Sequence, residues 1–421
     1  MASEHLHRRI LIGVLLGAGA GVLANLLFAG DPWLTGFIRY VTQPAGQIFL
    51  RLLLMLVIPL VFAGLVNGVA GLGDMRHLGR VGLKTLAFTL LFSALAVLLG
   101  LTIVNLLQPG AGVATAVREQ LLAGAAERAG SISIASRPDT GWNLLLAIVP
   151  DNPVRAAANG DMIAVMFFAL MLGIGLTLTH TEAARRFAGA IEGLYDVTMR
   201  LIAMVISLAP LGVAALLFTL TAQLGYSVLL QLGSYALVVI LALAIHQFIV
   251  YSLALKWYAG ISPRAFFRNV QSAMLTAFST ASSSATLPTS LQVANDKLRL
   301  PPQVARFVLT IGATANQNGT ALFEGITVLF LAQFYGVPLS LGEQGLVLFI
   351  CVLGGIGTAG VPAGSLPVVA MILGMVGIPA EGIGLILGVD RLLDMCRTTV
   401  NVTGDLVIAT LVARGEPRVT S

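Results

Sequence analysis

Long apolar runs separated by short polar loops occupy most of this chain. About 20 apolar residues in a helix cross the hydrocarbon core of a bilayer. Runs of at least this length lie near residues 10–29, 43–70, 81–107, 142–179, 193–222, 228–257, 303–334 and 382–412. The pattern predicts an all-α polytopic membrane protein with eight transmembrane helices.

Two further apolar stretches have a different pattern, in which a tip of small residues separates two apolar arms. The first tip is Ser279–Ser284, and the second extends from Gly354 to Ser365. Neither set of arms is long enough to span a bilayer, and irregular backbone at membrane depth is tolerated only where it is buried in protein or lines a cavity. We therefore expect two re-entrant helical hairpins whose tips meet near the midplane. A hairpin followed by a polar span occurs twice, which is typical of transporters.

Composition supports membrane insertion and excludes a soluble globular protein. Of 421 residues, 57% are hydrophobic and only 10% are charged. The net charge of +5 does not indicate nucleic-acid binding, because basic residues mark cytoplasmic loops in membrane proteins. The loops near 222–228 and 334–342 contain no Lys or Arg. This asymmetry predicts that both termini are cytoplasmic.

Three smaller features complete the organisation. Residues 108–141 are rich in Pro, Gly and Ala and are expected to form an external loop. The N-terminal segment has the character of a signal peptide, but its apolar run continues to Ala29, which favours an uncleaved first span. The two cysteines lie in apolar segments, so we expect no disulfide framework and no metal site.

The last apolar segment carries a stripe of charged and amide side chains. At the helical repeat, positions 390, 394, 397, 401 and 405 fall within roughly 80° of one another. Charges at membrane depth usually face a protein-lined cavity that holds a partner or ligand. Arg397 presents a planar fork suited to a carboxylate, and Asp394, one turn earlier, suits an ammonium. The pair predicts binding of an α-amino acid with a second carboxylate; the alternative is a structural ion-pair stripe.

Two short motifs resemble enzyme signatures without their context. Gly355–Gly360 matches the dinucleotide pattern, but no strand or βαβ unit surrounds it, so we interpret it as a glycine-rich gate. Ser282–Ser284 has no plausible general base nearby. Its hydroxyls and amides at the end of a half-helix fit a bound carboxylate better, with a flexible turn as the alternative. We do not expect an enzyme.

The apolar run 303–334 is interrupted by Asn316–Thr320, which predicts a broken helix that exposes polar groups to a ligand or ion. Glu324 lies one turn beyond Thr320 on the same face. Desolvation disfavours the charged form of a lone carboxyl, so Glu324 is a candidate proton carrier. A permanently protonated or salt-bridged structural glutamate is the alternative.

These motifs together resemble the glutamate/aspartate transporter family, which includes archaeal aspartate symporters, bacterial glutamate and dicarboxylate carriers, and eukaryotic excitatory amino acid transporters. The resemblance covers nearly the whole chain and is most specific at Ser282–Pro288, Asn316–Thr320, Gly357–Pro362 and Asp394–Asp405. It implies eight spans with two opposed hairpins in inverted repeats, a homotrimer in membrane lipid, and a transport domain that slides past a scaffold.

The resemblance also implies a division of the chain. Residues 1–80 and 142–228 are expected to form mainly the scaffold and trimerisation region, and residues 81–107 and 229–421 mainly the transport domain. Within the transport domain we expect four elements, the first hairpin, the broken helix, the second hairpin and the last helix, at about 263–298, 301–334, 340–378 and 381–413.

By this resemblance, Arg397 binds the side-chain carboxylate of the substrate and Asp394 binds its amino group. Asp394 argues against a plain dicarboxylate, and Arg397 argues against a neutral amino acid. The remaining substrate-binding residues implied are Ser282, Ser283, Thr320, Gly360, Val361, Thr398 and Asn401.

Departures from the family concern the coupling ion. Sodium-coupled members typically have Asn-Met-Asp-Gly-Thr in the broken helix, whereas this chain has Gln317 and Asn318, and Phe92 replaces a hydroxyl ligand although Ser93 remains. A neutral amide supplies a weaker field to a cation than a carboxylate, so one sodium site is expected to be lost. Two residual sodium sites are implied, one at Gly312, Asn316, Asn401 and Asp405, the other at Thr314, Gly355, Ile356 and Thr358.

Glu324 falls where the eukaryotic members keep a proton-carrying glutamate. The archaeal arginine beside the serine tip is Ala281 here, and Arg391 is a candidate substitute charge. We expect a proton-coupled secondary active symporter for acidic amino acids in an inner membrane, with elevator-type alternating access and no cofactor. The alternatives are a sodium-coupled symporter, a dicarboxylate carrier and an anion channel.

Overall fold

Helices make up the regular structure throughout the part of the chain that the computed structural model describes, which comprises residues 2–71, 79–112, 149–159, 161–357 and 365–414. The all-α expectation is confirmed for these residues. The N-terminal half contains α1 (Ala2–Phe28), α2 (Pro32–Phe37), η1 (Ile38–Thr42), α3 (Gln43–Leu54), α4 (Val57–Gly71), α5 (Gly79–Leu107), α8 (Pro153–Asn159), α9 (Met162–Leu178), α10 (Glu182–Ser207) and α11 (Ala209–Leu224).

The C-terminal half contains further helices in the same chain order. They are α12 (Ser227–Ile245), η3 (His246–Val250), α13 (Tyr251–Ala254), η4 (Leu255–Ala259), α14 (Pro263–Thr280), α15 (Ser283–Asp296), α16 (Pro302–Ala315), α17 (Asn318–Tyr335), α18 (Leu341–Gly357), α19 (Leu366–Met375), η5 (Ala380–Gly382) and α20 (Ile383–Ala413).

Two of the described helices are individually long and apolar enough to cross a membrane, Arg80–Leu107 and Val228–Ala259. The pair α10 and α11 qualifies together but bends by 56° at its junction. The bend follows from Pro210, which cannot donate to the carbonyl four residues earlier. The predicted run 43–70 likewise divides into α3 and α4, four residues before Pro59. The number of eight spans stays a prediction.

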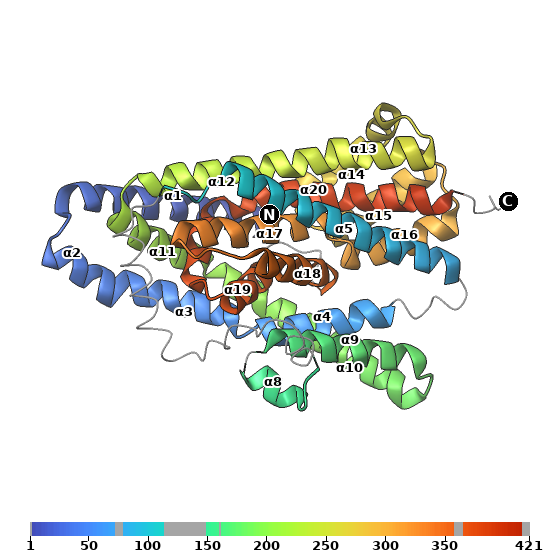
Figure 1. The fold of residues 1–421 in the computed structure, drawn as a ribbon, viewed down its shortest axis with the longest axis horizontal. Helices are drawn as coiled ribbons and strands as arrows, with labels where there is room; N and C mark the ends of the chain where they lie inside the picture. The colour runs from blue at the N-terminus through green and yellow to red at the C-terminus, as the bar shows by residue number, and fades with distance from the viewer. Residues whose placement is uncertain (1, 72–78, 113–148, 160, 358–364, 415–421) are drawn as a thin grey trace.

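The contacts divide the helices into two neighbouring groups, and in Figure 1 α4, α9 and α10 lie below α5, α17 and α20. In one group, α1 packs on α11, α3 on α11, and α4 on α9 and α10. In the other, α20 is surrounded by α14, α16, α17 and α12, and α5 packs along α17. Gly13 and Gly17 on α1 lie directly against the backbone of Pro210 and Ala214 on α11, so these two helices approach as closely as small-residue membrane interfaces do.

The first predicted hairpin, 263–298, corresponds to α14 and α15. Helix α14 continues through Thr280, beyond the expected end of its arm, and the chain reverses at Ala281, which has a left-handed backbone with φ of 47°. Ser282 then caps α15 by accepting a hydrogen bond from the Ala285 amide at 3.2 Å. The reversal therefore needs only two residues. The second hairpin corresponds to α18 and α19, and residues 358–364 of its tip lie outside the described residues.

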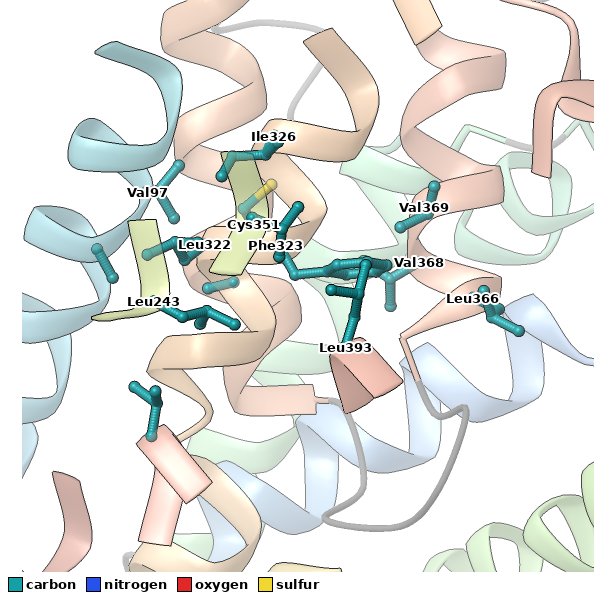
Figure 2. Close-up of a cluster of buried hydrophobic side chains, with 14 of the residues drawn as sticks. Val97, Leu243, Leu322, Phe323, Ile326, Cys351, Leu366, Val368, Val369 and Leu393 are labelled. Atoms are coloured by element: carbon teal, nitrogen blue, oxygen red, sulfur yellow. The ribbon is translucent and has the colours of Figure 1, made fainter. Parts of the chain in front are cut away.

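The broken helix is interrupted only at Asn316 and Gln317, since α16 ends at Ala315 and α17 begins at Asn318. Helix α17 is buried along nearly its whole length, between α5, α18 and α20. Figure 2 shows the apolar packing on one side of it, where the ring of Phe323 lies between Val368 and Leu393. This core fixes the start of α17 against the middle of α20, where the polar residues gather.

Candidate functional site

The most buried arginine of the described residues is Arg397 on α20, which is 1% exposed. Its Nη2 donates to Asp394 Oδ1 at 2.8 Å, and its Nη1 lies 3.2 Å from Asp390 Oδ1. The guanidinium carbon lies 3.9 Å from the centre of the Phe323 ring. Two carboxylates and an aromatic face thus hold the guanidinium in a desolvated position, where cation–π attraction is strongest.

A second arginine extends this arrangement. Arg391 Nη1 lies 3.8 Å from Asp394 Oδ2, the oxygen that Arg397 does not use. Arg391, Asp394, Arg397 and Asp390 therefore form a row of alternating charges, which we call the charge row, with a formal sum of zero. Within the described residues, Arg397 Nε has no hydrogen-bond partner, and Nη1 contacts Asp390 as an ion pair without hydrogen-bond geometry. Buried donors of this kind can receive an incoming carboxylate.

Amide side chains join the broken helix to α20. Asn401 Oδ1 accepts a hydrogen bond from the Gly319 amide at 2.7 Å. Its Nδ2 donates to Gln317 Oε1 at 2.6 Å and to Thr320 Oγ1 at 3.1 Å. Asn401 and Thr320, both predicted substrate-binding residues, are thereby brought together beside the charge row. Gln317, which replaces the family's methionine, completes this contact.

The first predicted residual sodium site is assembled around Asp405. Asn316 Nδ2 donates to Asp405 Oδ1 at 2.7 Å. The Asp405 carboxylate lies so close to Gly312 that a Cβ added to this glycine would collide with it. Asn316 Oδ1 is buried and has no hydrogen-bond partner among the described residues. Oxygen donors from Asn316, Asp405 and the nearby carbonyls are the ligands that hard cations prefer. The residues present fit a transported sodium ion.

The second predicted residual site is described only in part. Thr314 Oγ1 donates to the Ile311 carbonyl of its own helix at 3.0 Å. Gly355 packs against Ala321 and the Gln317 carbonyl. Thr358 lies outside the described residues, as does the side chain of Ile356. Among the described residues, no cluster of three or more His, Cys, Asp or Glu side chains could hold a metal.

Asn318 lies in a neutral hydrogen-bond network. Ser93 Oγ donates to Asn318 Oδ1 at 2.7 Å, and Asn318 Nδ2 donates to the Tyr251 hydroxyl at 3.1 Å. That hydroxyl donates to the Val400 carbonyl at 3.2 Å. Phe92 packs edge-on against the Tyr251 ring, with centroids 5.5 Å apart. The amide that replaces the family's aspartate is therefore occupied by protein hydrogen bonds.

Glu324 is fully buried on α17, and both of its carboxyl oxygens have no hydrogen-bond partner among the described residues. A Cβ added to Gly354 on α18 would lie 3.3 Å from Glu324 Oε2, so this glycine lets the hairpin arm approach the carboxyl. A carboxylate that is buried without hydrogen-bond donors carries a desolvation penalty that the protonated acid largely avoids.

The remaining predicted substrate-binding residues are placed as follows. Ser283 is 2% exposed and its hydroxyl has no hydrogen-bond partner in the part of the chain that the structure describes. The Ser282 hydroxyl caps α15. Thr398 is buried on α20 beside Arg397. Gly360 and Val361 lie outside the described residues.

The sequence did not predict the roles of three side chains of the site. Asp390 belongs to the predicted stripe but was not expected to pair with Arg397. Phe323 carries no signal of its own, because an aromatic residue in an apolar span is usually core. Tyr251 lies between the π-helical turns η3 and η4, which are not visible in an apolar sequence pattern; such turns are frequent at functional sites.

Comparison with known proteins gives matches over nearly the full length. The model of the sodium:dicarboxylate symporter family matches residues 6–415. The chain is 32% identical over 409 residues to the proton/sodium-glutamate symport protein of Bacillus subtilis (strain 168), covering 97% of this chain and 92% of that protein. It is 33% identical over 414 residues to the proton/glutamate-aspartate symporter of Escherichia coli (strain K12), with the same two coverages.

A relative with a different named substrate is equally similar. The C4-dicarboxylate transport protein of Granulibacter bethesdensis is 32% identical over 417 residues, covering 98% of this chain and 89% of that protein. Identity alone therefore does not separate acidic amino acids from plain dicarboxylates. The separation depends on the side chains of the site.

Proposed function

The chain belongs to the sodium:dicarboxylate symporter family, and from this membership and the charge row we propose that it is a symporter that carries acidic amino acids together with a cation. Its relatives are membrane transporters, and its apolar helices agree with a multi-pass membrane protein. The named relatives are symporters and transport proteins, not enzymes.

The observation that carries the substrate assignment is the 2.8 Å pair between Arg397 and Asp394. A substrate carboxylate displaces Asp394 from the guanidinium, and the released Asp394 receives the substrate ammonium. An acidic amino acid thus satisfies both members of the pair. A plain dicarboxylate satisfies Arg397 only, because it has no ammonium to take the place of the guanidinium beside Asp394.

Around this exchange, Thr398, Asn401, Thr320 and Ser283 supply hydroxyl and amide groups to the substrate. Ser283 is favoured by its buried, unbonded hydroxyl. Ser282, Gly360 and Val361 belong to the proposal by family resemblance, through the backbone of the two hairpin tips.

We propose that the coupling ion is a proton and that Glu324 carries it. Its unbonded, fully buried carboxyl supports this assignment, and several relatives carry the word proton in their names. The second candidate is sodium at Asn316, Asn401 and Asp405, favoured by the unbonded Asn316 oxygen. The name of the Bacillus subtilis relative includes both cations.

The working cycle that we propose is of the elevator type, in a homotrimer of an inner membrane with both termini cytoplasmic. Residues 81–107 and 229–421 move as the transport domain past residues 1–80 and 142–228. The packing of α5 on α17 and of α14, α16 and α17 on α20 supports a common moving unit. The packing of α1, α3, α4, α9, α10 and α11 among themselves supports the scaffold.

The test is uptake of radiolabelled L-glutamate and L-aspartate into proteoliposomes under an imposed inward proton or sodium gradient. We expect a proton gradient without sodium to drive accumulation, and Glu324→Gln to abolish this drive while exchange of internal for external substrate persists. Glu192→Gln, which neutralises an exposed glutamate on α10, is the matched control and should behave as wild type.

Two outcomes contradict parts of the proposal. If a proton gradient still drives accumulation by Glu324→Gln at the wild-type rate, Glu324 is not the proton carrier. If uptake requires sodium, the Asp405 site becomes the coupling centre. A channel cannot concentrate its substrate, so failure to accumulate against a gradient would exclude a symporter.

A further inference from the structure

Each oxygen of the Asp394 carboxylate faces a different arginine. Oδ1 accepts the hydrogen bond from Arg397 at 2.8 Å, and Oδ2 lies 3.8 Å from Arg391 Nη1. The second distance is too long for a hydrogen bond, which ends near 3.2 Å. Arg391 therefore stands close to Asp394 without being committed to it in this state.

Arg391 also differs from Arg397 in its surroundings. The Arg391 side chain is 25% exposed, whereas that of Arg397 is 1% exposed. Within the described residues, Arg391 Nη1 is buried and has no hydrogen-bond partner. An arginine at the edge of the site, with a spare donor aimed at Asp394, can move a short distance toward the carboxylate when its other partner leaves.

We propose that Arg391 is the counter-charge of Asp394 in the substrate-loaded carrier, and that it thereby sets how well the site tolerates acids without an α-amino group. The inference rests on the proposed function, because it assumes that the substrate carboxylate displaces Asp394 from Arg397. Arg391 acts through Asp394 and is a positioning residue.

The charges in the two loaded states give the direction of the effect. With an acidic amino acid bound, Asp394 faces both the substrate ammonium and Arg391. With a plain dicarboxylate bound, Arg391 is the only member of the charge row left to compensate Asp394. Removing Arg391 therefore takes away a positive charge next to Asp394 that the substrate ammonium replaces in the amino-acid-loaded state but that nothing in the dicarboxylate replaces. The empty carrier keeps the Arg397–Asp394 pair in either case.

The experiment measures the KM for L-aspartate and the inhibition constant of succinate for aspartate uptake, in proteoliposomes under one fixed gradient. For Arg391→Gln we expect the aspartate KM to rise about twofold to threefold and the succinate inhibition constant to rise about tenfold or more, the size of change expected for loss of a counter-charge at a largely buried carboxylate. Arg391→Lys should restore most of the succinate binding, because it keeps the positive charge.

Arg264→Gln removes the same charge from the exposed first turn of α14 and is the matched control, with both constants unchanged. The inference is overturned if Arg391→Gln changes both constants by the same factor, if it lowers only the maximal rate, or if wild type does not bind succinate at all. If Arg391→Gln fails to insert, Arg391→Lys is tested instead. The charge argument predicts that the lysine keeps the ratio of the two constants near its wild-type value, so a changed ratio also overturns the inference. Absence of aspartate uptake by wild type would instead refute the proposed function.

Discussion

The polar side chains at the centre of the molecule are bonded mainly to one another. Tyr251 is the clearest case, because its hydroxyl connects Asn318 on α17 with the Val400 carbonyl on α20. The Tyr251 side chain is fully buried, and Gly404 leaves it the space to reach this position. A single hydroxyl thus links the broken helix, the last helix and the continuous helix Val228–Ala259.

At this scale we predict that Tyr251→Phe destabilises the protein. The substitution removes the hydroxyl while the ring packing against Phe92 is kept, so a buried amide and a buried carbonyl lose their partner, at a cost of about 1–3 kcal/mol. The measurement is the free energy of unfolding from denaturant titration of the purified protein in detergent. Tyr226→Phe, at an exposed tyrosine, should stay within about 0.5 kcal/mol of wild type. Equal stability of the two variants would contradict the role given to the hydroxyl.

Among the helices, the decisive contact is the approach of the start of α17 to α20. A Cβ at Gly319 would lie 2.7 Å from the Arg397 carbonyl oxygen and 3.1 Å from Val400 Cβ. The obstacle is mostly backbone, which cannot turn aside as a flexible side chain can. Gly319 therefore sets the spacing at which its amide reaches Asn401 and the charge row lies beside the broken helix.

We predict that Gly319→Ala lowers both stability and uptake. Forcing α17 away from α20 costs about 1–3 kcal/mol, as overpacking of a core does, and lengthens the Gly319–Asn401 hydrogen bond. Gly345→Ala on α18 is the control, because an added Cβ meets nothing within 4 Å there. That change should be neutral or stabilise by up to about 1 kcal/mol. Thermal unfolding in detergent and initial uptake rates check both variants, and a fully active Gly319→Ala would contradict the argument.

The sequence predicted the elements around the site better than it predicted their contacts. The interruption at Asn316 and the extent of the last helix were visible because polar residues and glycines stand out in apolar runs. Helix periodicity placed Asp390, Asp394 and Arg397 on one face, but it could not show that they pair with one another. Such pairing depends on rotamers and on burial by α17, which are properties of the packed structure.

The errors in element boundaries also have physical causes. The run 43–70 divides before Pro59 and the run 193–222 divides before Pro210, because hydropathy does not register a missing amide donor. Helix α14 extends to Thr280 through residues that were expected to form an open tip. There Thr and Ser hydroxyls bond carbonyls of the preceding turn, so the polar residues remain helical. The roles of the predicted site residues stay predictions.

For the whole molecule, the proposed movement requires that α20 slides along α11 while α4 and α9 stay together. Two close glycine contacts, one between the two groups of helices and one within a group, provide sites to test this movement. A Cβ at Gly384 on α20 would lie 2.8 Å from Leu216 Cβ on α11, across the two groups of helices. A Cβ at Gly173 on α9 would lie 2.7 Å from Val69 Cβ on α4, within one group. Disulfides form at Cβ separations of about 3.5–4.5 Å, so a small adjustment suffices at either place.

We predict that a disulfide between Gly384→Cys and Leu216→Cys stops uptake, and that one between Gly173→Cys and Val69→Cys does not. Cys351 and Cys396, both free, are first replaced by alanine. The first bond joins a moving surface to a fixed one, whereas the second joins two surfaces that stay in register. Uptake is measured in proteoliposomes before oxidation, after oxidation and after reduction, so that the cost of the substitutions is separated from that of the bond. Full transport with the first pair oxidised would show that α20 does not move past α11, and would leave a cycle confined to the hairpins.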